Sequence, residues 1–291
     1  MKKIAFILIF AILAGIFGGC SLRTETAEIA ATTLPVYQFT SWLVNGTGLT
    51  VTRLVTENVS CLHDYSLHVG QVMAAEAAEL IVINGAGLED FMEDLLQDKQ
   101  VIDSSVGIEL LESCGDHGHD GHGHEHAQDP HIWLSVSNAK AMVHNIYQGL
   151  CRAYPQHRTA MEANLETLLD KLDALESYAT EKLQDLSCRK MITFHDGFAY
   201  FAQSLDLEIL ATVEEESGSE ASSKLLIELI ELVRAHDLPG IFIEANGADA
   251  AARTICAETD THLYILNMAM AGDDYFAAMY HNIDTLREAL E

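Results

Sequence analysis

One uninterrupted helical segment constrains the fold more than any other feature of this sequence. Residues 158–186 contain no glycine and no proline, and apolar side chains recur mainly three or four residues apart. About 29 residues rising roughly 1.5 Å each would form a rod of about 45 Å. An isolated coiled coil is one interpretation, but a single set of heptads between two mixed regions indicates a helix that joins two lobes. The apolar stripe consists of Met161, Leu165, Leu168, Leu172, Leu175, Ala179 and Leu186.

Strand-like and helical patterns alternate on both sides of this segment. Short β-branched runs followed by amphipathic runs are typical of parallel sheets flanked by helices. Ser217 and Glu220 have the spacing of a capping box, which predicts a helix from there to about Ala235. We therefore expect an α/β fold of two lobes with parallel-type sheets flanked by helices. The predicted ranges are an N-terminal lobe at 27–156, a linking helix at 157–187 and a C-terminal lobe at 188–291.

The charge balance excludes one class of partner. The chain has 16 Lys and Arg residues against 44 Asp and Glu, a formal net charge of -28. Such a field repels phosphate backbones and accumulates cations near the surface. We therefore expect no binding to nucleic acid.

The first 20 residues have the layout of an export segment. Lys2 and Lys3 precede an apolar run that is too short and too rich in glycine for a permanent membrane helix, which predicts a signal peptide at 1–19. "FGGC" resembles the bacterial lipobox, so Cys20 is the predicted lipidation site and 20–26 a linker to the fold. A plain cleaved signal with an incidental Cys20 is the alternative.

The remaining cysteines do not predict a thiolate metal site. No two of them form a CxxC pair, and an odd number leaves at least one unpaired, so the sequence assigns no disulfide. They are Cys61, Cys114, Cys151, Cys188 and Cys256.

A histidine-rich loop at 115–128 stands out by composition. Its histidines alternate with glycine and acidic residues, and such a segment cannot bury enough surface to fold by itself. Neutral imidazoles bind Zn²⁺ and similar ions, although ordering the loop keeps any one arrangement weak. We expect a metal-collecting role, with a solvated loop as the alternative. These histidines are His117, His119, His122, His124 and His126.

Three other histidines lie where a parallel sheet places ligands. His63 in "CLHDYSL" follows a predicted strand, His195 in "TFHDGFAYF" lies between a strand and a helix, and His131 in "DPHIWL" precedes an apolar triplet. Ligands bind outside the carboxyl ends of parallel strands, so histidines from both lobes could converge across a cleft.

The motifs "HDYSL", "DPHIWL" and "FHDGFAYF" resemble the ligand motifs of the metal-binding subunits of bacterial zinc and manganese ABC importers, the cluster A-I solute-binding proteins. The likeness extends from "TTLPVYQF" to "GDDYFAAMYHNIDTLREAL", and the histidine-rich insertion resembles the zinc-uptake branch. The resemblance implies two α/β lobes joined by one rigid helix, with the metal in the cleft. It assigns His63 and His131 as ligands from the first lobe and His195 from the second. Three imidazoles favour Zn²⁺ over Mn²⁺.

The fourth ligand and the supporting carboxylates stay open at this point. Many relatives have an aspartate after the final strand, where this chain has Asn267; water, Glu244 or Asp273 could complete a tetrahedron instead. Carboxylates close to the ligands can orient a ligating imidazole, with a helix cap or turn as the alternative role. These carboxylates are Asp64, Asp129 and Asp196.

The sequence therefore predicts an extracytoplasmic zinc-binding lipoprotein, tethered to the cell membrane or periplasmic, that delivers Zn²⁺ to the permease and ATPase subunits of an ABC importer. A manganese importer of the same family and a metal-storing surface adhesin are the alternatives. Three histidines plus water would also suit a zinc hydrolase, but the chain contains no HExxH motif, and we expect it not to be an enzyme. We expect a monomer.

Overall fold

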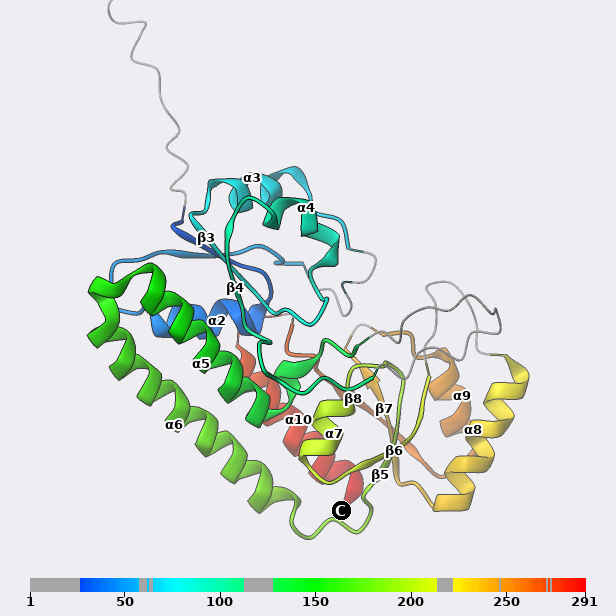
Figure 1. The fold of residues 1–291 in the computed structure, drawn as a ribbon. Helices are drawn as coiled ribbons and strands as arrows, with labels where there is room; N and C mark the ends of the chain where they lie inside the picture. The colour runs from blue at the N-terminus through cyan, green and yellow to red at the C-terminus, as the bar shows by residue number, and fades with distance from the viewer. Residues whose placement is uncertain are drawn as a thin grey trace, which may run out of the picture.

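The computed structural model describes residues 27–57, 62, 65–112, 128–213, 222–245, 247–270, 272 and 274–291. These residues form two α/β lobes, each built on a four-stranded sheet (Figure 1). Every pairing between strands is parallel, which confirms the predicted fold class. Across the described ranges, no helix has the length and apolar character needed to span a bilayer.

The first lobe has strand order β2-β1-β3-β4, formed by Val51–Arg53, Ile29–Ala31, Leu80–Ile83 and Gln100–Asp103. Side chains alternate between its two faces as the pleat requires. Ile29 and Val82 pack toward α2 (Leu34–Leu43) and α5 (Val136–Ala153), whereas Ala30 and Ile81 belong to the cluster beneath α3 (Val69–Ala77) and the η1–α4 turn (Asp90–Met92, Glu93–Leu96). Both faces are covered, which explains the uninterrupted apolar run of β3.

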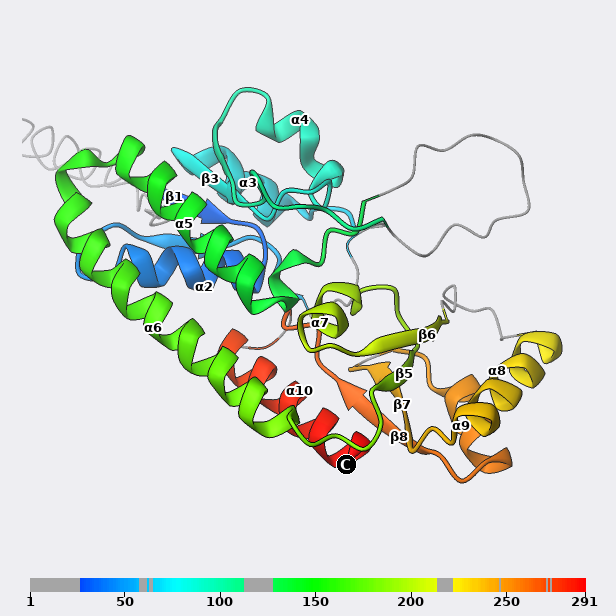
Figure 2. The same ribbon diagram turned by 60° about the horizontal axis from the view of Figure 1, so that its bottom comes forward.

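The second lobe repeats this order as β6-β5-β7-β8, formed by Glu208–Thr212, Lys190–Thr193, Gly240–Glu244 and His262–Leu266. Ile192 and Ile241 pack with α8 (Ser223–His236) and α9 (Ala250–Glu258). Met191 and Phe242 face the core shared with α7 (Ala199–Ser204) and α10 (Tyr275–Leu290). Figure 2 shows α8 and α9 on the far side of this sheet from α10.

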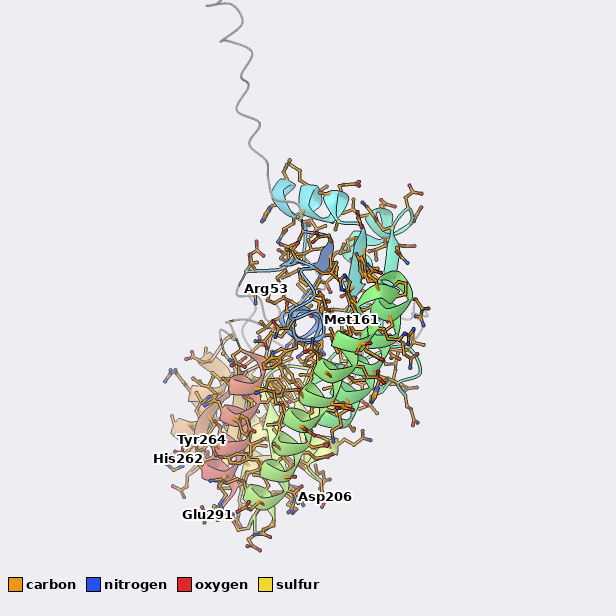
Figure 3. All side chains as sticks on the ribbon, turned by 90° about the vertical axis from the view of Figure 1, so that its left-hand side faces the viewer. Arg53, Met161, Asp206, His262, Tyr264 and Glu291 are labelled. Atoms are coloured by element: carbon orange, nitrogen blue, oxygen red, sulfur yellow. The ribbon has the colours of Figure 1, made fainter. Side chains whose placement is uncertain are left out.

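Helix α6 (Arg158–Leu183), entered through the turn η3 (Pro155–His157), runs along both lobes. It packs on α2 and α5 of the first lobe and on α10 of the second. In Figure 3 it extends from Met161 beside the first lobe to the end of the molecule where Asp206 and Glu291 are labelled. The predicted stripe is buried from Met161 to Ala179, and Leu183 rather than Leu186 ends it, because the helix stops at Leu183.

The predicted start of one helix differs from the structure. α8 begins at Ser223 and is capped by Ser222, whose hydroxyl accepts the N–H of Leu225 at 3.2 Å. The expected capping pair Ser217 and Glu220 lies outside the described residues, as do the signal peptide, Cys20, Cys61 and Cys114. Cys151, Cys188 and Cys256 are free thiols.

Candidate metal centre

His131 occupies a fixed position at the start of η2 (Ile132–Leu134). The apolar triplet of η2 is fully buried, so the backbone on which His131 stands is anchored in the core. The His131 side chain is only 3% exposed, and its Nδ1 lies 2.7 Å from Oδ1 of Asp129, which also accepts the His131 backbone N–H at 2.9 Å. Because an ionised carboxylate only accepts hydrogen bonds, Nδ1 carries the proton and Nε2 is left as the ligating atom.

The second lobe contributes His195 and Glu244 from the ends of adjacent strands. β5 ends at Thr193, two residues before His195, and Glu244 is the last residue of β7. The connections after β5 and β7 leave the sheet on opposite sides of this point, which is where open α/β sheets form a crevice. Nδ1 of His195 lies 3.8 Å from Oε2 of Glu244, and both side chains are largely buried.

The histidines of the two lobes meet at the junction between the lobes. The ring centroids of His131 and His195 are 5.4 Å apart and the rings are nearly perpendicular, at 85°. Zinc–nitrogen bonds of about 2.0–2.1 Å place the ring centroids of two tetrahedral ligands roughly 5 Å apart. The observed separation is therefore compatible with one zinc ion bound between the two rings.

The remaining predicted site residues do not complete a metal site among the residues that the structure describes. Among the residues that the structure describes, no three His, Cys, Asp or Glu side chains gather in a group that could hold a metal ion. His63, Asp64, Asp273 and the histidine-rich loop fall in the ranges that are not described.

Asn267 and Asp196 are both described. The side-chain oxygen of Asn267 accepts the N–H of Ala269 at 2.7 Å, which uses that oxygen locally. Asp196 is buried, and the N-cap position of α7 belongs to Phe198, so Asp196 does not cap that helix.

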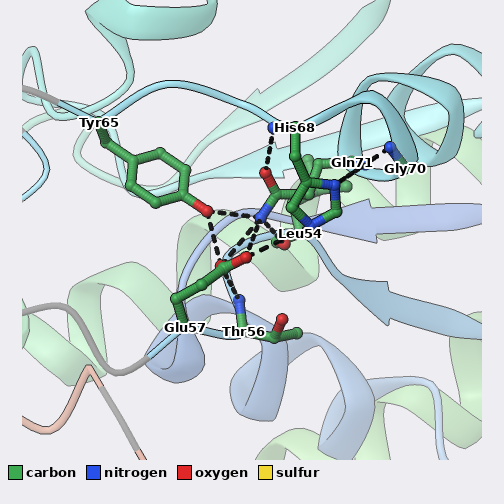
Figure 4. A network of polar contacts seen from close by, with 7 residues as sticks. All are labelled: Leu54, Thr56, Glu57, Tyr65, His68, Gly70 and Gln71. Atoms are coloured by element: carbon green, nitrogen blue, oxygen red, sulfur yellow. Dashed lines mark hydrogen bonds and ion pairs between the residues drawn. The ribbon is translucent and has the colours of Figure 1, made fainter.

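A polar network fixes the two ends of the segment that carries His63 (Figure 4). Gln71, buried on α3, donates to the carbonyl of Leu54 at 2.9 Å and to both carboxylate oxygens of Glu57 at 3.0 and 3.2 Å. The Tyr65 hydroxyl donates to Glu57 at 2.6 Å, and this bond lowers the pKa of that carboxyl. His68 caps α3 through Nδ1. Glu57 and Tyr65 are therefore held together on either side of residues 58–64.

Glu89 is a buried carboxyl that sequence reasoning missed. It accepts the Thr32 hydroxyl at 2.6 Å and the backbone N–H groups of Asn84 and Gly85 at 2.8 and 2.9 Å. Burial raises its pKa to about 7, partly offset by these bonds. The side chain of Asn84 then donates to the carbonyl of Pro130 at 3.0 Å, so this loop supports the segment that carries His131. The glycines of "NGAGLED" were a signal of a tight loop after β3.

Trp133 and Tyr275 tie the lobes together beside the two histidines. The indole N–H of Trp133 donates to the carbonyl of Met268 at 2.7 Å, and the Tyr275 hydroxyl donates to the carbonyl of Trp133 at 2.8 Å. Arg53 adds a bond of 2.9 Å to the carbonyl of Gly272. The lobes are thus in direct contact around the site.

This architecture defines a two-lobed solute-binding protein whose lobes are joined by one rigid helix. Residues 29–289 match the family described as zinc-uptake complex component A, periplasmic, and the chain belongs to that family. It is 28% identical to a putative metal-binding protein of Treponema pallidum, covering 97% of this chain and 96% of the relative. It is 29% identical to the zinc-binding lipoprotein AdcA of Streptococcus pneumoniae over 100% of this chain and 62% of AdcA's length. The crystal structure of a protein named ZnuA superposes with a TM-score of 0.78 at 28% identity, covering 91% of this chain and 100% of that one.

Proposed function

We propose that this protein captures Zn²⁺ outside the cytoplasm and delivers it to the membrane permease and ATPase subunits of an ABC importer. Membership of the zinc-uptake family supports this function, as does the zinc-binding name of the AdcA relative. The observation that carries the proposal is the approach of His131 and His195, one from each lobe, to a ring separation of 5.4 Å. Zn²⁺ is the cargo of this protein and not a resident cofactor.

The proposed ligands are His63, His131 and His195, with Glu244 as the fourth. Three imidazoles and one carboxylate suit a tetrahedral zinc ion. Glu244 is favoured over Asn267 because its carboxylate lies beside His195, whereas the Asn267 oxygen already accepts the Ala269 N–H. Because the ligands come from different lobes, a small relative movement of the lobes would dismantle the site and release the ion.

Competitive zinc titration of the full-length protein, purified in detergent, tests this ligand set. We expect one tight Zn²⁺ per chain, lost or weakened at least a hundredfold in His63→Ala, His131→Ala and His195→Ala. Glu244→Gln should weaken binding less, by about tenfold. His262→Ala, an exposed histidine on β8, is the matched control and should bind as the parent does. Tight binding that survives all three ligand substitutions would refute the assignment.

The same titration separates the alternatives. A manganese importer would bind Mn²⁺ more tightly than Zn²⁺ in competition. Deleting residues 115–127 should leave the tight site intact, whereas a metal store would lose most of its capacity.

We propose that the loop histidines collect Zn²⁺ for the tight site, so this deletion should slow zinc uptake at low zinc concentration. We further propose that the chain is not an enzyme, which predicts no zinc-dependent hydrolysis of ester, peptide or β-lactam substrates.

The protein acts outside the cytoplasm, as its family does. We propose that Cys20 is lipidated after cleavage of residues 1–19 and that 20–26 link the anchor to a monomeric fold. The lipoprotein name of the AdcA relative supports the anchor. Labelling cells with a radioactive fatty acid should mark the parent protein but not Cys20→Ala, and light scattering should give the mass of one chain.

A further inference from the structure

Tyr200 is the side chain through which the second lobe reaches the base of the histidine-rich segment. It lies on α7, five residues after His195 on the same strand–turn–helix unit, and is 2% exposed. Its hydroxyl accepts the backbone N–H of Leu111 at 2.8 Å and donates to the carbonyl of Asp129 at 3.0 Å. Both of these residues belong to the first lobe.

The two backbone groups bound by Tyr200 belong to a short antiparallel stem. Glu112 and Gln128 form an antiparallel bridge, and the Asp129 N–H donates to the Leu111 carbonyl at 2.8 Å. In a regular antiparallel ladder, Leu111 and Asp129 would exchange a second bond, from the Leu111 N–H to the Asp129 carbonyl. Here that second connection runs through the Tyr200 hydroxyl. A side chain of the second lobe therefore completes a two-stranded stem of the first.

The stem leads directly to His131. The carboxylate of Asp129 accepts both the backbone N–H and the ring Nδ1 of His131. On the other side, Asn84 holds the Pro130 carbonyl. The three residues 129–131 are consequently fixed from the first lobe by Asn84 and from the second lobe by Tyr200.

We propose that Tyr200 is a positioning residue. It couples the position of His131 to that of His195 and so preorganises the metal site across the two lobes. This inference rests on the proposed function. His195 and Tyr200 move together because they are on one unit, and the hydroxyl transmits that position to Asp129 and His131. A site whose ligands are already in place loses less free energy to ordering when it binds its ion. Burial raises the pKa of the phenol, so the hydroxyl stays protonated and keeps donating at neutral pH.

Tyr200→Phe removes only the hydroxyl and keeps the buried ring. In the full-length protein we expect zinc affinity to fall about tenfold, the effect of one buried hydrogen-bonding group, chiefly through faster release. The visible spectrum of bound Co²⁺ should change as well, because the geometry at the metal is altered. Tyr178→Phe is the matched control: its hydroxyl bonds Asp284 on the outer helices at 2.6 Å, and its loss should leave affinity, release and spectrum unchanged.

The outcomes separate this inference from the proposed function. If the parent protein binds no Zn²⁺, the proposed function fails. If the parent binds tightly and Tyr200→Phe matches it in affinity, release rate and Co²⁺ spectrum, the inference is overturned even if the melting temperature falls. Should Tyr200→Phe not fold, Tyr200→Met also removes the hydroxyl and its bond to Asp129, and a flexible apolar side chain can fill the space of the ring. Parental binding by a folded Tyr200→Met would also overturn the inference.

Discussion

The Nδ1 atom of His131 lies 2.7 Å from Oδ1 of Asp129, and neither side chain is more than 3% exposed. This bond fixes both the tautomer and the orientation of the imidazole, and carboxylates in such positions commonly contribute tenfold to a hundredfold to metal affinity. Asp129→Ala should therefore weaken zinc binding by about that amount, whereas Asp129→Asn, which keeps an acceptor oxygen, should weaken it less.

A chelator competition assay measures both effects. Asp249→Ala is the control, because Asp249 pairs with Arg253 on the exposed surface of α9 and touches neither histidine. Equal affinity of Asp129→Ala and Asp249→Ala would show that Asp129 does not orient a ligand.

Gly197 leaves the space that the His195 ring occupies. A Cβ atom at this position would lie 2.8 Å from Cδ2 and 3.0 Å from Nε2 of His195, and 2.5 Å from the end of Met268. Gly197→Ala should displace the imidazole and lower zinc affinity about tenfold, the cost of overpacking by one methyl group. Titration of Gly197→Ala/Met268→Ala is the control: relieving only the contact with Met268 should not restore affinity. Full recovery of zinc affinity in the double variant would show that the clash with Met268, and not displacement of His195, causes the loss.

Local patterns in the sequence predicted much of the fold. The stripe from Met161 to Ala179 is a property of one continuous helix, so its period identified α6 without any knowledge of the partner helices. The predicted end of this helix, at Leu186, was three residues too late. Leu186 continues the apolar pattern, but α6 ends at Leu183.

Contacts between distant residues could not be predicted in this way. Tyr200 and Leu111 are 89 residues apart, and Thr32 and Glu89 are 57 apart, so no spacing rule connects them. The contact between Asp129 and His131 spans only two residues, so their spacing in the sequence was enough to suggest it. Whether His63 joins these histidines stays a prediction.

Gln71 holds the ends of the segment that contains His63. Gln71→Leu keeps the side-chain volume but leaves the Leu54 carbonyl and the Glu57 carboxylate without their shared donor. We expect the free energy of unfolding to fall by about 1–3 kcal/mol and zinc affinity to fall with it. Denaturant titration of the metal-free protein measures the first effect and chelator competition the second. Gln184→Leu, at the exposed end of α6, should change neither. If Gln71→Leu lowers the free energy of unfolding but binds zinc as tightly as the parent, this network does not support the metal site.

Glu89 predicts a pH dependence of stability in the metal-free protein. Its pKa is raised from 4.5 to about 7 in the folded state, so the folded protein holds this proton more tightly than the unfolded chain. The stabilisation is complete below pH 4.5 and is lost as the pH rises through 7. The free energy of unfolding should fall by about 3 kcal/mol over this range. Glu89→Gln cannot ionise, so its free energy of unfolding should not show this decline with pH. The amide beside the Gly85 N–H adds a cost, but that cost is the same at every pH. Glu93→Gln, exposed on α4, should keep the parental slope. Urea unfolding at intervals from pH 5 to 8 gives the difference between parent and Glu89→Gln, and a difference that does not vary with pH would contradict the assignment.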